Sequence, residues 1–194
     1  MKRLLLICSV LIILASCATS SPSLNYYLLD TEDTRTTIVG SAQQDKKSDR
    51  LILVGDVTLS EFLRQPSLLV ELDDNEMHFA MNHVWAEPLV DELPKVLLKD
   101  LRRSNTEFSF ERGTAEWLGN QAYSLKIEIE QFHPNAKQEV IMSGRYWITE
   151  TASGQVKEKD FYLSDTLTEV NYGHAIVKMR RLITVLAESL VRSL

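Results

Sequence analysis

The chain of 194 residues has only two cysteines, Cys8 and Cys17, and both lie within its first 17 residues. Glycine and proline are also scarce, with seven and five residues, which excludes collagen-like and proline-rich low-complexity proteins. Basic residues number 21 against 27 acidic ones, so broad attraction to nucleic-acid phosphates is not expected. The remaining composition, 44% hydrophobic and 25% charged, is typical of a globular protein of one domain with a tail.

A hydrophobic run long enough to span a bilayer is missing from the N-terminus. Residues 4–14 form an apolar run of 11 residues, whereas a membrane span needs about 20. The run follows Met1-Lys2-Arg3 and precedes small residues, the pattern of a secretory signal. Its end, Leu14-Ala15-Ser16-Cys17, resembles a bacterial lipobox, which implies cleavage between Ser16 and Cys17 and a diacylglyceryl group on Cys17. A plain signal peptide with a chance cysteine is the alternative.

Cleavage would divide the chain into a signal peptide (1–16), a lipidated tether (17–24) and one domain (25–194). It removes Lys2 and Arg3 and no acidic residue, so 178 residues with a formal charge of −8 remain. No thiol is then left in the domain for a disulfide, a nucleophile or a metal ligand. Two or three acyl chains are needed for stable membrane retention. Ala18 resembles the residue found after the cysteine in lipoproteins sorted to the outer membrane.

Apolar and alternating segments predict a series of strands. The β-rich run 51–59 is nearly continuous and suggests a strand buried on both faces, followed by one helical turn in 60–66. Segments 67–72 and 76–81 flank Asp73-Asp74-Asn75 and read as a hairpin. Segments 123–130, 140–149 and 156–163 read as an antiparallel meander. A short first strand is expected within residues 25–30, and residues 31–50 are expected to form a long loop.

Two helices are predicted, over residues 85–103 and 172–194. Pro88 fits the first turn of the former, and Pro94 should kink that helix or delay its start. In the latter, apolar residues recur every three or four positions, as in a helix laid across a sheet or, alternatively, a coiled coil. The fold class is therefore α+β, a mostly antiparallel sheet with two principal helices packed on one face.

The search for catalytic chemistry finds no phosphate-binding, dinucleotide-binding, serine-hydrolase or zinc-protease motif. His78 and His83 lack a clear third ligand, so two solvent-side histidines are the preferred interpretation over a metal site, and His83 is expected to help begin the helix. Glu87, Asp91 and Glu92 could perform acid/base work in a cleft, but acidic residues also favour the positive end of a helix dipole. No catalytic constellation is predicted, and no cofactor besides the covalent lipid on Cys17.

Aromatic residues allow two interpretations. Trp85, Trp117, Trp147 and the pair Tyr26-Tyr27 could line a lipid groove or a protein interface, although single aromatics on amphipathic elements usually belong to the core. Trp147 differs because its predicted strand face is otherwise polar. An exposed tryptophan there would mark a contact surface. Trp85 and Trp147 are the candidate partner or lipid contacts.

With these elements in place, the sequence resembles the PqiC/YmbA-like ABC-type transport auxiliary lipoproteins. The matching stretches are Y-Y-L-L at 26–29, L-I-L-V-G-D-V-T-L at 51–59, F-L-R-Q-P-S-L-L-V at 62–70 and H-V-W-A-E-P-L at 83–89. The W-A-E-P-L run at 85–89 is the most specific of these. Two departures from the family pattern are His83-Val84, where an arginine is often adjacent to the tryptophan, and the unmatched segment 31–50.

The resemblance implies an outer-membrane lipoprotein facing the periplasm and acting with an MCE-domain bridge protein and an inner-membrane component in lipid transport. It implies a docking or anchoring role, not an enzyme, and a homo-oligomer. The alternative is a lipid-binding periplasmic carrier module, which a deep apolar cavity would favour and a well-filled core would disfavour. A lipid-anchored hydrolase is a third hypothesis, and it has no motif.

Overall fold

A five-stranded sheet with the order β5-β2-β6-β7-β8 forms the body of the molecule. The computed structural model describes residues 23–30, 50–73, 76–104, 107–113 and 121–194. The strands of this sheet are β2 (Leu51–Leu59), β5 (Ser109–Arg112), β6 (Gln121–Pro134), β7 (Glu139–Glu150) and β8 (Val156–Thr166). The predicted meander is confirmed by the antiparallel pairing of β6, β7 and β8. The sheet is nevertheless mixed, because β2 pairs in parallel with both β5 and β6.

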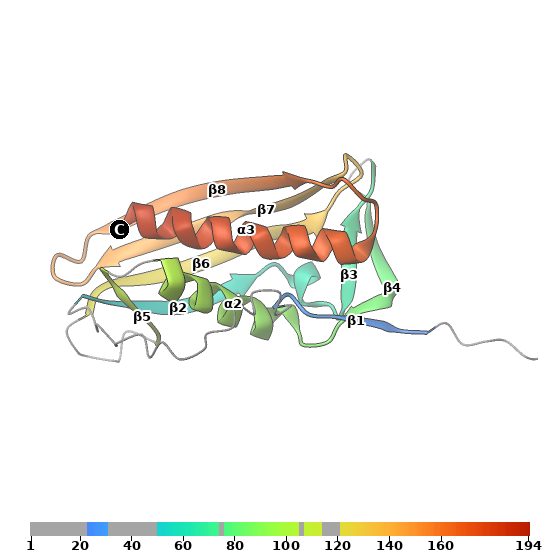
Figure 1. Cartoon of the computed structure of the whole chain (residues 1–194). Helices are drawn as coiled ribbons and strands as arrows, with labels where there is room; N and C mark the ends of the chain where they lie inside the picture. The colour runs from blue at the N-terminus through green and yellow to red at the C-terminus, as the bar shows by residue number, and fades with distance from the viewer. Residues whose placement is uncertain (1–22, 31–49, 74–75, 105–106, 114–120) are drawn as a thin grey trace, which may run out of the picture.

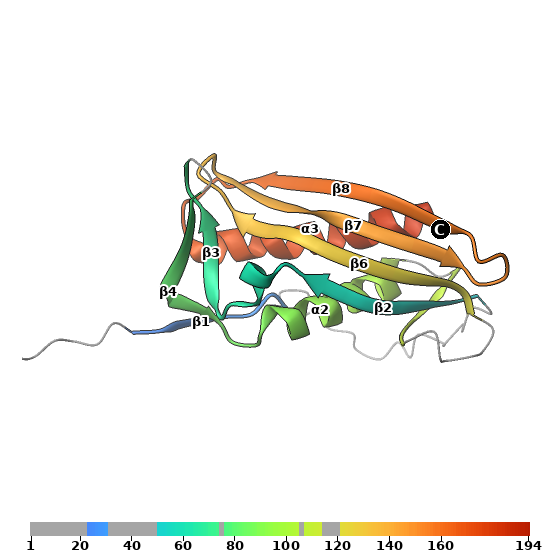
Figure 2. The same ribbon diagram turned by 180° about the vertical axis from the view of Figure 1, so that it is seen from behind.

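A smaller sheet, ordered β1-β4-β3, stands crosswise at one end of the larger one (Figures 1 and 2). It contains β1 (Asn25–Tyr27), β3 (Ser67–Glu71) and β4 (Met77–Trp85), and the 3-10 helix η2 (Glu61–Arg64) leads into it. The predicted hairpin is confirmed, since β3 and β4 pair antiparallel. β1 adds in parallel to the other side of β4.

Both long helices, α2 (Leu89–Ser104) and α3 (Tyr172–Ser193), cover the same face of the five-stranded sheet (Figures 1 and 2). The Asn171 side chain accepts a hydrogen bond from the His174 amide and caps α3. The apolar seam of α3 is buried, including Ile176, Met179 and Ile183, as expected for a helix packed on a sheet. The α+β class with two helices on one face is therefore confirmed.

The start of α2 corrects a prediction. The helix begins at Leu89, and Trp85 is the last residue of β4, where its amide donates to the Pro66 carbonyl. Pro88 supplies the first carbonyl, which accepts from the Asp91 and Glu92 amides. Pro94 lies inside the helix, where the missing N–H removes one bond in the helix ladder. The helix starts five residues before Pro94, so the delay expected from this proline is not observed, and the later start follows from the extension of β4 through Trp85.

Other boundaries differ in detail from the predictions. β1 covers three residues of the segment predicted over 25–30, and β5 was not predicted as a strand. Burial on both faces holds for Ile52, Leu53 and Val54 in β2, but the following four residues are partly or fully exposed. The segment 31–49 and the loop 114–120 lie outside the described residues, as does Trp117.

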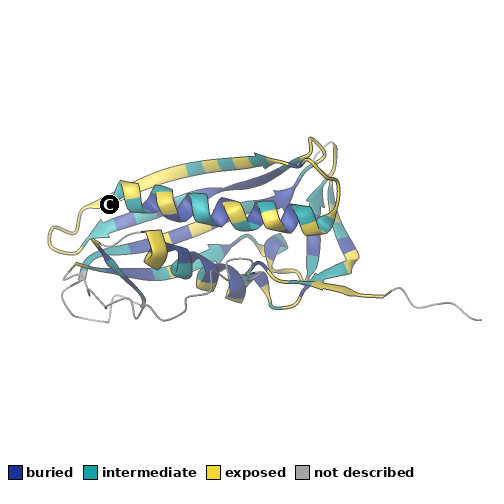
Figure 3. Ribbon diagram, in the orientation of Figure 1, coloured by how far each residue is buried: buried dark blue, intermediate teal, exposed yellow. Residues whose placement is uncertain are grey.

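The core lies between the two helices and the inner face of the large sheet (Figure 3). Leu125, Ile127 and Ile129 of β6 alternate with exposed Lys126 and Glu128, the period of two expected for a half-buried strand. Opposite them, Tyr146 and Ile148 of β7 face the same core. One face of the sheet is therefore covered by helices and the other is left open.

Candidate functional site

The segment 85–89 joins the small sheet to α2. Trp85 is buried at the end of β4, and its neighbour Ala86 donates a backbone hydrogen bond of 2.7 Å to the Tyr27 carbonyl at the end of β1. A small residue at position 86 fits this position beside β1. The tryptophan of the W-A-E-P-L run therefore closes the core where three chain segments meet.

The second half of this segment begins the helix. Glu87 forms an ion pair with Lys95, which lies further along α2. Pro88 exposes its carbonyl to two amides of the first turn, and Leu89 is buried below it. The end of a strand is thus followed by an acidic residue, a proline and an apolar residue. This order is typical of a junction between a strand and a helix. The geometry gives this run a structural role.

Glu92 is a buried carboxylate of this first turn. Its Oε1 accepts hydrogen bonds from the amides of Leu29 at 2.7 Å and Asp30 at 3.2 Å, just after β1. Burial raises the pKa of Glu92, and the two backbone donors act in the opposite direction. Within the described residues, Oε2 is buried without a hydrogen-bond partner. The helix-dipole interpretation overlooked this role, although the spacing of position 92 from Leu89 already placed it on the apolar face.

A network of charges continues from this point across both helices. Lys99 of α2 contacts Asp30 at 2.6 Å, and the Nη2 of Arg180 in α3 contacts the buried Asp100 at 2.7 Å. Asp100 also accepts a hydrogen bond of 2.9 Å from the Thr184 hydroxyl. These two carboxylates are paired with cations of the helical layer, and the Thr184 hydroxyl adds a hydrogen bond. They hold the end of β1, α2 and α3 together and are not a free acid/base pair.

The histidines are placed differently from their prediction. His78 is exposed, but His83 is half-buried in β4, where its Nδ1 lies 2.8 Å from the Tyr27 hydroxyl and its ring stacks on Tyr172. The expectation that His83 lies on the solvent side and begins the helix is wrong, because β4 extends through Trp85. No group of three or more potential metal ligands occurs in the described part of the chain.

His133 is buried in β6, and sequence reasoning assigned it no role. Its Nδ1 lies 3.2 Å from the Pro134 carbonyl, and burial lowers its pKa. Among the described residues, Nε2 has no hydrogen-bond partner. An imidazole enclosed in this way belongs to the packing of the sheet.

Trp147 lies on the open face of the large sheet. The Lys126 ammonium is 5.2 Å from its ring and the Arg145 guanidinium is 6.0 Å away, so two cations flank the indole. Arg145 also contacts Glu158 at 3.2 Å and Asp160 at 2.8 Å across the strands. The indole is partly exposed among charged side chains, an arrangement suited to contact with another molecule.

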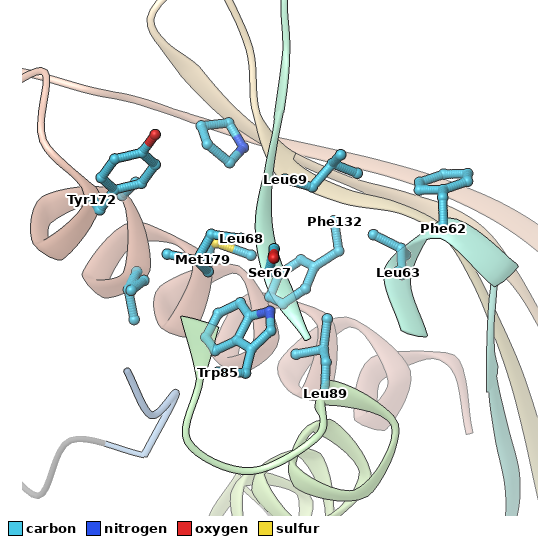
Figure 4. A pocket seen from close by; sticks show the side chains of 13 residues that line it. Phe62, Leu63, Ser67, Leu68, Leu69, Trp85, Leu89, Phe132, Tyr172 and Met179 are labelled. Atoms are coloured by element: carbon cyan, nitrogen blue, oxygen red, sulfur yellow. The ribbon is translucent and has the colours of Figure 1, made fainter. Parts of the chain in front are cut away.

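A pocket between the small sheet and α3 has no room for a lipid chain (Figure 4). Trp85, Phe132, Tyr172 and Met179 help line this cavity, whose volume is only about 10 Å³. Such a volume holds at most one water molecule. The core between the small sheet and α3 is therefore well filled at this point. Trp85 contributes to that packing and presents little surface to a partner.

The family comparison identifies the whole domain. The model of the ABC-type transport auxiliary lipoprotein component matches residues 27–191, from the last residue of β1 to the last turn of α3. This chain belongs to that family. No helix of the described residues is both long and apolar enough to cross a membrane.

Individual relatives match this chain over most of its length. The chain is 24% identical over 163 residues to the intermembrane transport lipoprotein PqiC of Escherichia coli K12, covering 84% of this chain and 82% of PqiC. The Shigella flexneri protein of the same name gives the same values. A solved structure of an uncharacterized protein has a TM-score of 0.72 and 19% identity over 88% of this chain and 98% of its own. Protein XCC0632 of Xanthomonas campestris has a TM-score of 0.62 and 14% identity over 75% and 85%.

Proposed function

We propose that this auxiliary lipoprotein takes part in lipid transport between membranes. It is anchored in the outer membrane, faces the periplasm, and docks an MCE-domain bridge protein that acts with an inner-membrane component. The observation that carries the proposal is the match across the whole domain to a family of transport auxiliary lipoproteins, whose relative PqiC is named for intermembrane transport. The filled interior supports docking over carriage, because a carrier needs a cavity for the acyl chain.

The anchor in this proposal is the lipid on Cys17. The sequence Leu14-Ala15-Ser16-Cys17 places the acceptor thiol directly after the cleaved Ser16–Cys17 bond. The domain has a surplus of negative charge, so attraction to anionic lipid headgroups cannot hold it at a membrane. Retention must then come from the acyl chains, each buried CH₂ of which contributes about 0.8 kcal/mol.

The docking surface in this proposal is the open face of the large sheet around Trp147. An aromatic side chain flanked by cations is the kind of residue that dominates the binding energy of protein interfaces. The acidic residues beside it provide a polar rim. A homo-oligomer would repeat this surface around a symmetry axis and present several identical docking sites to the bridge protein.

Substitution of the two cysteines tests the anchor. We expect Cys17→Ala to move most of the protein from the membrane fraction to the soluble fraction, because the lipid acceptor is lost. The matched control is Cys8→Ala, which leaves Cys17 in place and should not change the distribution. Membrane retention of the Cys17→Ala protein equal to that of the unsubstituted protein would contradict the anchor.

Cross-linking tests the partner. The lipoprotein, expressed with the MCE-domain protein of the same cell, should co-purify with it after mild cross-linking. Native mass spectrometry of the detergent-solubilised lipoprotein reports the number of copies and any bound phospholipid. Persistent absence of the MCE-domain protein would contradict docking, and stoichiometric phospholipid on a monomer would favour the carrier.

A further inference from the structure

The first strand carries apolar side chains on its outer face. Leu24, Tyr26 and Leu28 are 51%, 65% and 43% exposed, whereas the intervening Tyr27 is half-buried and Leu29 is fully buried. From Tyr26 to Leu29 this alternation follows from the period of two in an extended chain, and Asn25 before them is exposed as well. β1 is correspondingly seen as an exposed strand at the small-sheet end of the molecule (Figure 3). We call Leu24, Tyr26 and Leu28 the β1 strip.

The chain that leads into the β1 strip is uncharged. Residues 18–29 contain no charged side chain, in a chain in which a quarter of the residues are charged. Beside the strip, Tyr26 pairs with Val84 of β4, and Val84 pairs with Ser67 of β3. Ser67 in turn lines an open hollow together with Phe79, the exposed Met81 and the charged Glu61, which is 3.7 Å from Arg64. Exposed apolar side chains therefore continue from β1 across the small sheet as far as this ion pair.

The acidic residues of the small sheet lie at its other end. Glu71, Asp73 and Glu76 flank the turn of the β3–β4 hairpin, whereas β1 pairs with β4 at positions 83–85. These three acidic residues are thus separated along β4 from the β1 strip. Nearer to the strip, Asp30 and Glu87 are paired with Lys99 and Lys95.

The chain length fixes how far the β1 strip can be from the lipid anchor. Seven peptide steps separate Cys17 from Leu24, and each extended residue spans at most about 3.3–3.6 Å, so the two are within about 25 Å of each other. Figure 1 shows that β1 lies at the small-sheet end, away from the C-terminus of α3. An anchor on Cys17 therefore brings this end of the molecule to the membrane surface.

We propose that the β1 strip rests in the headgroup region of the membrane to which Cys17 is attached; this inference depends on the lipid anchor of the proposed function. Tyrosine suits this environment, because its ring is apolar and its hydroxyl can remain hydrated. The contact orients the domain, with the small sheet near the lipid and the β7–β8 turn far from it. An acyl anchor alone would leave the orientation free.

Site-specific fluorophores test this contact in the full lipoprotein. After processing, Cys8 is lost and the Cys17 sulfur is alkylated, so an engineered cysteine is the only reactive thiol. The variants are Tyr26→Cys and Leu28→Cys. The matched control is Val156→Cys, whose side chain is apolar and 55% exposed at the start of β8, beside the β7–β8 turn. Each protein is labelled with an environment-sensitive dye and placed in vesicles of phosphatidylethanolamine and phosphatidylglycerol.

Dyes at positions 26 and 28 are expected to emit at shorter wavelength than the dye at 156. We also expect at least twofold stronger quenching of these dyes by nitroxides attached to lipid headgroups. Equal quenching at all three positions overturns the inference. A dye at position 26 that is shielded from both lipid and aqueous quenchers also overturns it, in favour of a protein covering the strip. Labelling of the unsubstituted mature chain at Cys17 refutes the anchor itself, which separates that failure from the others.

Discussion

The two faces of the five-stranded sheet carry the same types of polar interaction in opposite environments. On the covered face, Asp100 and Arg180 join two helices with side chains that are 5% and 17% exposed. On the open face, Arg145 and Asp160 form an ion pair whose acidic side chain is 78% exposed. Burial makes the first pair necessary to the fold, because either charge alone would be left desolvated. Solvent makes the second pair dispensable, so the open face is free to serve a partner.

Removing the buried acid should give the largest effect. We expect Asp100→Ala to lower the free energy of unfolding by about 3–5 kcal/mol, since Arg180 and Thr184 lose their shared acceptor in the helical layer. Urea denaturation monitored by circular dichroism measures this change. The matched substitution on the open face is Asp160→Ala, which should leave the urea midpoint unchanged within error. Similar losses in both variants would remove the distinction between the two faces.

The pH dependence of stability, measured at the buried Glu92, gives a second test of the difference between the two faces. Burial raises its pKa above the ordinary value of 4.5, so the folded protein binds a proton at Glu92 more tightly than the unfolded chain does. The stabilisation linked to this proton is fully present below pH 4.5 and is lost as the pH rises through the folded-state pKa. We therefore expect the Tm of the unsubstituted protein, relative to Glu92→Gln, to fall as the pH rises from 4 to 8.

The control for this measurement is Glu128→Gln, an exposed glutamate of the open face that accounts for the chemical change from acid to amide. Differential scanning calorimetry at closely spaced pH values records both variants. A constant difference in Tm between the unsubstituted protein and Glu92→Gln across this range would show that Glu92 does not carry a raised pKa.

A small effect on stability is expected at Trp147. Trp147→Ala should lower the free energy of unfolding by no more than about 1 kcal/mol, because the indole is partly exposed on the open face. Trp85→Ala, in contrast, should cost about 3–5 kcal/mol, because it empties a buried position. If the open face docks the bridge protein, Trp147→Ala also reduces cross-linking to that protein severalfold. Undiminished cross-linking would place the docking surface elsewhere.

The sequence predicted the elements whose signal is local. The meander β6-β7-β8 and the helix α3 follow from periods of two and of three to four residues, which depend only on neighbouring positions. Parallel pairing of β2 with β5 and β6 depends on segments more than 50 residues away, and nothing in the local pattern of β2 specifies it. β5 was missed because four residues are too few to show alternation.

The same distinction applies to the candidate site. The unusual position of Trp147 could be predicted because side chains alternate between the two faces of a strand. This alternation placed Trp147 on a face that is otherwise polar. Trp85 was assigned to the wrong element, because the amide contact with Pro66 that extends β4 is tertiary. The burial of Glu92 was in principle visible from helical spacing, but its backbone partners Leu29 and Asp30 were not. The local sequence around a side chain contains little information about its contacts with distant segments of the chain.

The position of α3 after all the strands has a consequence for biogenesis. Eight of its side chains complete the core, and both edges of β2 are paired only once β5 and β6 have formed. In a chain that emerges N-terminus first, α2 covers only part of the inner face of the sheet, and the part under α3 stays uncovered until this helix of 22 residues is delivered. During this interval the uncovered apolar face is open to aggregation. Chaperones that bind unfolded clients therefore have their longest opportunity on this protein before α3 packs on the sheet.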